Sequence, residues 1–186
     1  MTLFSEFQTY ACNGNEWSGS SQTIAYFRAL EDQYRRALAI FHGLARGSAV
    51  SLGWGGWQAR WDAPATGGGR SLFARFSAIM RESDFESFEV IDSATAPADI
   101  LAMTRTLARY GPVMLAYYKP TQDSPAAAGA QLRAVLSAGF LERLLGARMF
   151  AFSFMDTSFA TAEPASVATV RAALSRFGCD RCAALG

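Results

Sequence analysis

Residues 111–118, Gly-Pro-Val-Met-Leu-Ala-Tyr-Tyr, decide the fold class. The Gly-Pro pair stops any preceding helix, and the six residues after it form a near-continuous apolar run. A short run of this kind is typical of a strand that is buried on both faces. Helical patterns lie on both sides of it, at 97–110 and 125–146. The segment therefore predicts a strand inside a sheet that helices cover.

The same alternation extends in both directions from this strand. From residue 71 onward the pattern predicts helix, strand, helix, strand, helix, strand and helix, at 71–80, 88–91, 97–110, 113–118, 125–146, 148–155 and 164–177. This order predicts an α/β fold, with α+β as the alternative, built on one sheet covered by helices. Residues 1–186 form a single globular domain in this interpretation, and residues 178–186 form a frayed tail.

A long helix and a hairpin are predicted before residue 71. Apolar residues recur at three- and four-residue steps from Ile24 to Ala45, and Gly47 follows as a helix end. The next segment, 49–61, reads Ala-Val-Ser-Leu-Gly-Trp-Gly-Gly-Trp-Gln-Ala-Arg-Trp. Because Gly-Gly suits a two-residue turn, this segment predicts a β-hairpin with Trp54, Trp57 and Trp61 on one face. These rings are candidates for a sugar-stacking platform, and packing in the core is the alternative.

Composition and charge exclude several classes of protein. Apolar residues make up 51% of the chain, charged residues 18%, and the net charge is +1. The chain therefore has no general field that would attract nucleic acid or an acidic membrane. Lys119 is the only lysine, which is typical of GC-rich bacterial genes that use arginine freely. No signal peptide or membrane-spanning run is recognisable, so we expect a cytoplasmic protein, with export by a dedicated secretion system as the alternative.

Cysteine and histidine offer little for catalysis or metal binding. Cys179 and Cys182 follow a helix, whereas reactive pairs of this spacing are usually stabilised by a helix that begins after them. Three cysteines and one histidine, scattered along the chain, are too few to suggest a zinc site, so we expect no metal and no cofactor. Any histidine-dependent catalysis must use His42, and Cys12 is its candidate partner.

A glycine-rich segment and a group of carboxylates are further candidates. Residues 67–71 precede a helix and are candidates for binding an anion, with a flexible loop as the alternative: Gly67, Gly68, Gly69, Arg70 and Ser71. Carboxylates gather around one helix–strand junction, at Glu82, Asp84, Glu86, Glu89 and Asp92. Such a group could supply a pair for acid–base catalysis, or it could be a solvated loop.

Two segments resemble the papain-like cysteine peptidases of bacteria. The helix at 97–110 followed by Gly-Pro-Val-Met-Leu-Ala resembles the helix and Gly-Pro strand of that family, and residues 15–18, Asn-Glu-Trp-Ser, resemble its nucleophile segment. The resemblance implies the peptidase fold. Ser18 stands where the catalytic cysteine would be, and no histidine follows Val113. It therefore implies an inactive relative, or a hydrolase that uses other residues.

Three classes of function follow from these patterns. The absence of a complete catalytic set favours a non-catalytic protein-binding module, such as an adaptor, chaperone or immunity-type bacterial protein, whose partner is another protein or a second copy. The first alternative is a hydrolase that uses Cys12, Ser18, His42 or the carboxylates. The second alternative is a sugar or small-molecule binder that uses the predicted tryptophan hairpin.

Overall fold

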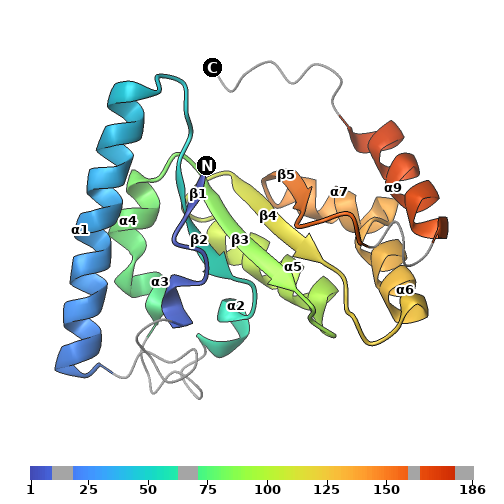
Figure 1. Cartoon of the computed structure of the whole chain (residues 1–186), viewed down its shortest axis with the longest axis horizontal. Helices are drawn as coiled ribbons and strands as arrows, with labels where there is room; N and C mark the ends of the chain where they lie inside the picture. Colours follow the sequence, from blue (N-terminus) through green and yellow to red (C-terminus); the bar gives the residue numbers. More distant parts are fainter. Residues whose placement is uncertain (10–18, 63–70, 159–163, 179–186) are drawn as a thin grey trace.

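The computed structural model describes residues 1–9, 19–62, 71–158 and 164–178. Five strands form one sheet in the order β1-β2-β3-β4-β5, and every neighbouring pair is parallel. The strands are β1 (Thr2–Leu3), β2 (Ser51–Gly55), β3 (Glu86–Ile91), β4 (Val113–Lys119) and β5 (Met149–Phe154). The predicted α/β fold is therefore confirmed (Figure 1).

Helices connect the successive strands, as a parallel sheet requires. The connecting helices are η1 (Phe7–Thr9), α1 (Ser21–Leu44), α2 (Gln58–Trp61), α3 (Leu72–Arg75), α4 (Ser77–Glu82), α5 (Ala96–Leu107), α6 (Pro125–Val135) and α7 (Ala138–Gly146), and α9 (Pro164–Phe177) follows β5. The predicted helix at 125–146 is two helices, because the backbone of Ser137 is extended and starts α7 anew. Within the described ranges, no helix combines the length and hydropathy that a bilayer crossing needs.

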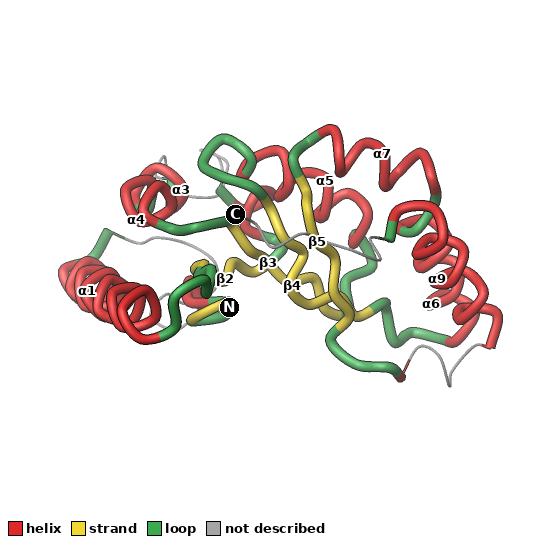
Figure 2. The backbone as a smooth tube through the Cα atoms, turned by 90° about the horizontal axis from the view of Figure 1, so that it is seen from above, coloured by secondary structure: helices red, strands yellow, loops and turns green. Residues whose placement is uncertain are grey.

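The strand order sets which face of the sheet the helices cover. The order never reverses, so right-handed crossovers place successive helices on the same face. Side chains of alternate strand residues, such as Trp54, Phe88 and Leu115, are buried in the common core with the helices. Figure 2 shows α5 and α7 on this face, and no described helix lies over the opposite face of β3 and β4. The opposite face carries Ser87, Glu89 and Tyr117.

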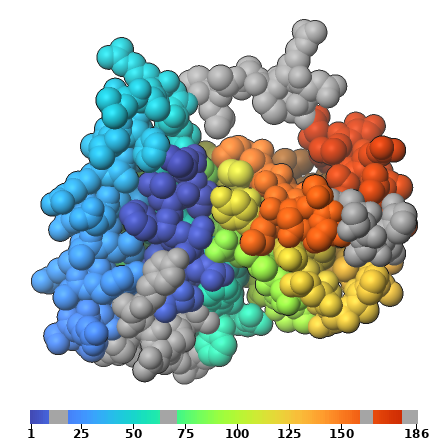
Figure 3. Space-filling model, in the orientation of Figure 1, coloured from blue at the N-terminus to red at the C-terminus, as the bar shows by residue number. Residues whose placement is uncertain are grey.

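An aromatic cluster fixes the N-terminal segment to the sheet. The ring of Phe7 in η1 lies 4.7 Å from Trp54 and 4.8 Å from Phe76, and Phe27 of α1 lies 5.0 Å from Phe76. All four side chains are fully buried. Edge-to-face packing of this kind stabilises aromatic pairs beyond the area that they bury. The cluster therefore holds residues 4–9 against β2, where the dark-blue atoms lie in Figure 3.

The predicted hairpin at 49–61 is wrong. Strand β2 pairs in parallel with β3, with Trp54 next to Phe88, and the chain then enters α2. Gly55 and Gly56 allow close packing rather than a tight turn, and neither has a positive φ. A Cβ on Gly56 would lie 2.3 Å from Val90 Cγ2 and 2.5 Å from the Glu89 carbonyl oxygen. The four-residue step from Trp57 to Trp61 is a helical spacing.

Glu86 is a carboxyl group buried at the start of β3. The residue is fully buried, and neither side-chain oxygen has a hydrogen-bond partner among the described residues. Because burial penalises the charged form, the pKa of Glu86 is raised to about 9. Glu86 is therefore a neutral acid near pH 7. When it ionises, its side chain must leave the core, or the folded state loses free energy because the charge is not solvated.

Replacing Gly56 with alanine should destabilise the fold. The added Cβ meets the backbone of β3, which cannot move aside as a flexible side chain could. We expect Gly56→Ala to lower the free energy of unfolding by about 1–3 kcal/mol, the usual cost of overpacking. Urea denaturation followed by circular dichroism measures the change.

Gly43→Ala is the matched control for this substitution. A Cβ at Gly43 in α1 meets nothing within 4 Å, so alanine should raise the free energy of unfolding by roughly 0.5–1 kcal/mol through helix propensity. Equal effects of the two substitutions would contradict the packing role of Gly56.

Ionisation of Glu86 should make stability depend on pH. Its pKa is higher in the folded chain than in the unfolded chain, so its contribution is full below pH 4.5 and is lost as pH rises toward 9. The limiting slope is about 1.4 kcal/mol per pH unit for one group. Glu86→Gln cannot ionise, so we expect the free energy of unfolding between pH 7 and 9 to fall less in this variant. Urea titrations at several pH values test this, and parallel curves would contradict it.

Candidate functional site

A polar pocket lies where β2 and β3 end, and we call it the strand-end pocket. Its volume is about 460 Å³, and it is lined by Gly56, Trp57, Arg60, Trp61, Glu89, Val90, Ile91, Asp92, Ser93, Ala94, Thr95 and Asp99. Because the strand order never reverses, the sheet has no switch point of the kind that binds ligands in doubly wound folds. In closed barrels, which share this sequential order, sites lie at the carboxyl ends of the strands. The strand-end pocket occupies that position.

Two of the three predicted tryptophans line this pocket. Trp57 is half-buried, and the side chain of Trp61 is 38% exposed. Trp54 instead lies in the core beneath the helices, where it is fully buried. The centre of its ring lies 4.7 Å from that of Phe73. The structure therefore separates the three rings, and only Trp57 and Trp61 offer surface to a ligand.

The loop after β3 is organised by the carboxylate of Asp99. Its Oδ2 accepts hydrogen bonds from Thr95 Oγ1 at 2.7 Å and from Ser93 Oγ at 3.1 Å. Arg60 Nη2 lies 3.5 Å from the same oxygen, and Arg60 Nη1 donates to Thr95 Oγ1 at 3.1 Å. These bonds join α2 to α5 across the pocket floor. They also engage the only cation among the residues that line the pocket.

Glu89 lies in the pocket and is hydrogen-bonded to Glu6 of the N-terminal segment. Burial, the nearby charge of Glu6 and the hydrogen bond to Glu6 together raise the pKa of Glu89 to about 7, and burial is the largest of the three causes. Burial also raises the pKa of Glu6, while the same hydrogen bond lowers it. The pKa values of both carboxyl groups are therefore raised, mainly by burial. Glu89 is therefore a carboxyl group that exchanges its proton near neutral pH.

Two buried polar atoms beside this pair have no hydrogen-bond partner among the described residues. They are Oε1 of Gln8, whose side chain is fully buried, and the indole Nε1 of Trp57. Gln8 Nε2 donates to the carbonyl oxygen of Gly55 at 3.4 Å, and Gly55 is the strand neighbour of Glu89. A Cβ on Gly55 would meet both Gln8 Nε2 and the Trp57 ring. An unsatisfied acceptor and an unsatisfied donor therefore lie at the same junction as the carboxyl pair.

Asp92 supplies an exposed carboxylate at the rim of the pocket. It follows β3 directly, and its backbone adopts the left-handed region with φ 49°. The conformation is held by its N–H, which donates to the Lys119 carbonyl at 3.1 Å, and by its Oδ1, which accepts from the N–H of Gln122 at 2.7 Å. A left-handed residue that the surroundings hold in place is common at functional sites.

The single histidine lies at the amino ends of the strands, away from the strand-end pocket. His42 Nε2 is 2.8 Å from Asp84 Oδ2, which also accepts from the N–H of Val50 at 2.8 Å. These contacts tie the end of α1 to the segment before β2, at the amino ends of the strands. His42 is thus separated from the strand-end pocket by the length of β3. Cys12, its candidate partner in catalysis, and Ser18, which stands at the nucleophile position of the peptidase resemblance, lie outside the described residues.

The predicted anion site lies mostly outside the described residues. Gly67, Gly68, Gly69 and Arg70 belong to that part, as do Cys179 and Cys182. Ser71 caps α3, its hydroxyl donates to Asp62 Oδ2, and the N–H of Leu72 donates to Asp62 Oδ1 at 2.7 Å. A carboxylate of the chain itself therefore already occupies the start of this short helix.

The predicted group of carboxylates is divided between the amino ends and the carboxyl ends of the strands. Glu82 and Asp84 lie before β3 and Glu86 at its start, whereas Glu89 and Asp92 reach the strand-end pocket. Glu6, Gln8, Arg60 and Asp99 are site residues that the sequence patterns did not indicate. In the described part of the chain, no three histidine, cysteine or carboxylate side chains are placed to hold a metal ion.

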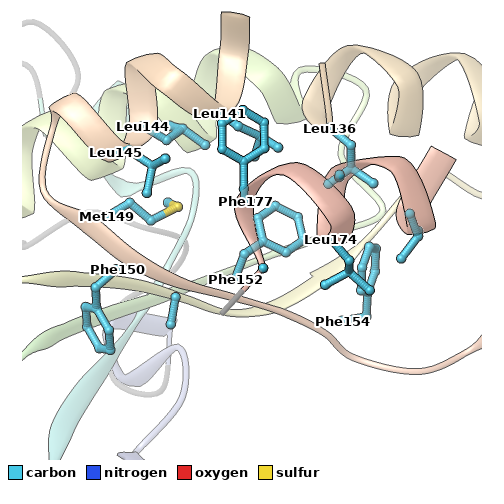
Figure 4. A pocket seen from close by; sticks show the side chains of 14 residues that line it. Leu136, Leu141, Leu144, Leu145, Met149, Phe150, Phe152, Phe154, Leu174 and Phe177 are labelled. Atoms are coloured by element: carbon cyan, nitrogen blue, oxygen red, sulfur yellow. The ribbon is translucent and has the colours of Figure 1, made fainter. Parts of the chain in front are cut away.

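A second cavity, the apolar groove, lies between α7, β5 and α9. Its volume is about 300 Å³, and Figure 4 shows its wall of leucine, phenylalanine and methionine side chains, among them Leu141, Leu144, Phe152, Leu174 and Phe177. No ionisable side chain lines it. The groove can therefore exclude water, but it offers no group for acid–base chemistry.

The chain was compared with models of protein families, with curated proteins and with solved structures, and none of them matches it.

Proposed function

We propose that the chain binds a carbohydrate in the strand-end pocket. The observation that carries the proposal is that Trp57 and Trp61 share one pocket with Glu89 and Asp92. A sugar ring has apolar C–H faces that pack on aromatic rings, and hydroxyl groups around its edge that hydrogen-bond to carboxylates. Small-molecule sites combine apolar walls with a few placed polar groups in this way.

The unsatisfied indole of Trp57 favours a ligand that can accept a hydrogen bond. Trp57 lines the pocket, and its Nε1 has no partner among the described residues. Buried polar atoms usually find partners, and a sugar hydroxyl can accept from an N–H group while it donates to a carboxylate.

The charges of the pocket favour a neutral ligand over an anion. Arg60 pairs with Asp99 and donates to Thr95, so its charge is partly neutralised within the chain and attracts a phosphate or a carboxylate less strongly. Glu89 and Asp92 would repel such groups when ionised. The raised pKa of Glu89 keeps the total negative charge of the pocket low near pH 7, which weakens the case for a cationic ligand.

Protein binding is the second candidate function, and the apolar groove is the observation that favours it. Its wall could cover an apolar segment of another protein, as grooves of this kind do for amphipathic helices. The groove alone does not identify a partner. The strand-end pocket is the stronger basis because its side chains supply both an apolar surface and hydrogen-bonding groups.

Trp61→Ala should weaken carbohydrate binding. We expect at least one of cellohexaose, xylohexaose, maltohexaose and chitohexaose to bind the full chain, and the loss of an aromatic wall to raise its Kd about tenfold. Isothermal titration calorimetry measures the change. Failure of all four hexasaccharides to bind the folded wild-type chain at millimolar concentration would contradict the proposal.

Tyr117→Ala is the matched control for Trp61. The two aromatic side chains are exposed to almost the same degree, 39% and 38%, but Tyr117 does not line the strand-end pocket. We expect its removal to leave the Kd unchanged. Equal losses in the two variants would show that binding depends on the uncovered sheet face rather than on the pocket.

A further inference from the structure

We infer that the apolar groove binds an acidic amphipathic segment of another protein. The apolar side chains of that segment fill the groove, and its carboxylates pair with arginines on the groove walls. This function is distinct from carbohydrate binding, because the groove and the strand-end pocket have no lining residue in common. The shape of the groove, the charge of its walls and one ion pair between two of them support it.

The groove is a concave apolar surface that the described residues leave open to solvent. Side chains of α7, β5 and α9 surround one space of about 300 Å³ (Figure 4). Leu145 is 50% exposed and Leu174 is 62% exposed, although both line this space. Large apolar side chains that stay exposed around a hollow are typical of a surface that binds a partner.

Helix α9 turns an apolar face toward the groove without burying it. The residues that line the groove recur at three- and four-residue steps, as one face of a helix does: Val170, Ala173, Leu174 and Phe177. Within residues 165–177, only Ser166 is buried. Because most of the stability of a helix in a protein comes from packing of its apolar face, α9 gains stability from a ligand that packs on this face.

The walls of the groove carry an excess of positive charge. The charged residues of α7, β5, α9 and the turn before β5 are four arginines and one glutamate: Arg143, Arg148, Arg171, Arg176 and Glu142. All four arginines are exposed, and each is the sequence neighbour of a residue that lines the groove. Arginine keeps its charge at every physiological pH, so the apolar groove has cationic walls.

One ion pair joins two of the walls and brings their arginines close together. Arg176 Nη2 of α9 lies 2.7 Å from Glu142 Oε1 of α7. Arg143 directly follows Glu142 in the sequence, so it lies in the neighbourhood of Arg176. A single carboxylate cannot neutralise both cations. A ligand that occupies the groove beside this ion pair therefore gains from a negative charge of its own.

The other three arginines have no carboxylate partner among the described residues: Arg143, Arg148 and Arg171. Arg148 donates one N–H to the carbonyl oxygen of Ala108 at 2.9 Å, which leaves the other donors of its guanidinium group for a ligand. A guanidinium group pairs well with a carboxylate, because its donors lie in one plane. The groove is therefore complementary to a segment that carries aspartate or glutamate beside apolar residues.

The same features disfavour two other occupants. A second copy that covers the groove with its own groove about a two-fold axis would bring the same arginines into opposition, and like charges repel each other. A bilayer surface takes up apolar side chains that protrude, whereas these side chains line a hollow. A segment with acidic and apolar residues matches both the charge and the shape.

A peptide selection on the full chain tests the chemistry of the ligand. A phage library of random dodecapeptides is selected on the wild type and, in parallel, on Leu174→Ala. We expect the wild type alone to enrich peptides that combine leucine, isoleucine or phenylalanine with aspartate or glutamate. Absence of such peptides, or their equal enrichment by the two proteins, would overturn the inference.

Charge reversals on the walls test the pairing with carboxylates. The most enriched peptide is labelled with fluorescein, and its Kd is measured by fluorescence anisotropy. We expect Arg143→Glu and Arg171→Glu each to raise the Kd about fivefold, because a repulsion replaces an attraction. The matched control is Arg36→Glu, which changes an exposed arginine of α1, far from α9 in Figure 2, and should leave the Kd unchanged. Equal effects of the three reversals would show that only the net charge of the chain matters.

Leu174→Ala tests the apolar contact with the same peptide. The side chain is exposed, so we expect the variant to fold, which circular dichroism checks, and to raise the Kd about tenfold. Leu44→Ala is the control, because Leu44 is an 86% exposed leucine at the end of α1, and the Kd should not change. An unchanged Kd in Leu174→Ala would place the peptide outside the groove and contradict the inference.

Two further measurements test the other occupants. Light scattering after size-exclusion chromatography gives the molar mass, and sedimentation with phosphatidylserine vesicles measures membrane binding. We expect Leu174→Ala to change neither result. A dimer that this variant dissociates, or vesicle binding that it abolishes, would overturn the inference in favour of a second copy or a membrane.

Discussion

The junction between Glu89 and the N-terminal segment depends on how closely that segment lies against β2. A Cβ on Gly53 would lie 2.9 Å from Ser5 Cα and from Thr2 Cγ2, and one on Gly55 would lie 2.8 Å from Gln8 Nε2. Glycine at these two positions therefore lets a backbone segment occupy space that side chains fill elsewhere in the sheet. Without this approach, Glu6 could not reach Glu89, and Gln8 could not lie beside Trp57. The buried ring of Phe7 supplies the energy that keeps the segment in place.

The amino ends and the carboxyl ends of the strands carry different kinds of polar contact. At the amino ends of the strands, Asp84 binds His42 and the backbone of Val50, so its oxygens are used to join elements of the fold. At the carboxyl ends, Glu89 and Asp92 keep capacity for a ligand. The sequence places these carboxylates within ten residues of one another. Strand β3 separates them in space, so residues that are close in the sequence do not form one cluster in the structure.

The fold class could be predicted from the sequence because the apolar run at 113–118 and its helical neighbours have different periodicities. The hairpin could not be rejected, because Gly-Gly followed by Trp at steps of three and four fits both a turn and the start of a helix. Glu89 and Asp92 were among the predicted carboxylates. Glu6 could not be found, since its role comes from a contact with a strand more than eighty residues away, and no local pattern records such a contact.

Lys119 gives the molecule a chemical handle of unusual selectivity. It is the only lysine, it ends β4 close to the loop that holds Asp92, and its ammonium group lies 3.3 Å from Asp156. Lys119 is therefore the one side chain to which an amine-directed reagent would attach, and the N-terminal amino group is the other target of such a reagent. A fluorophore placed there would sit near the mouth of the strand-end pocket, and its emission would report occupancy in real time without any engineered cysteine.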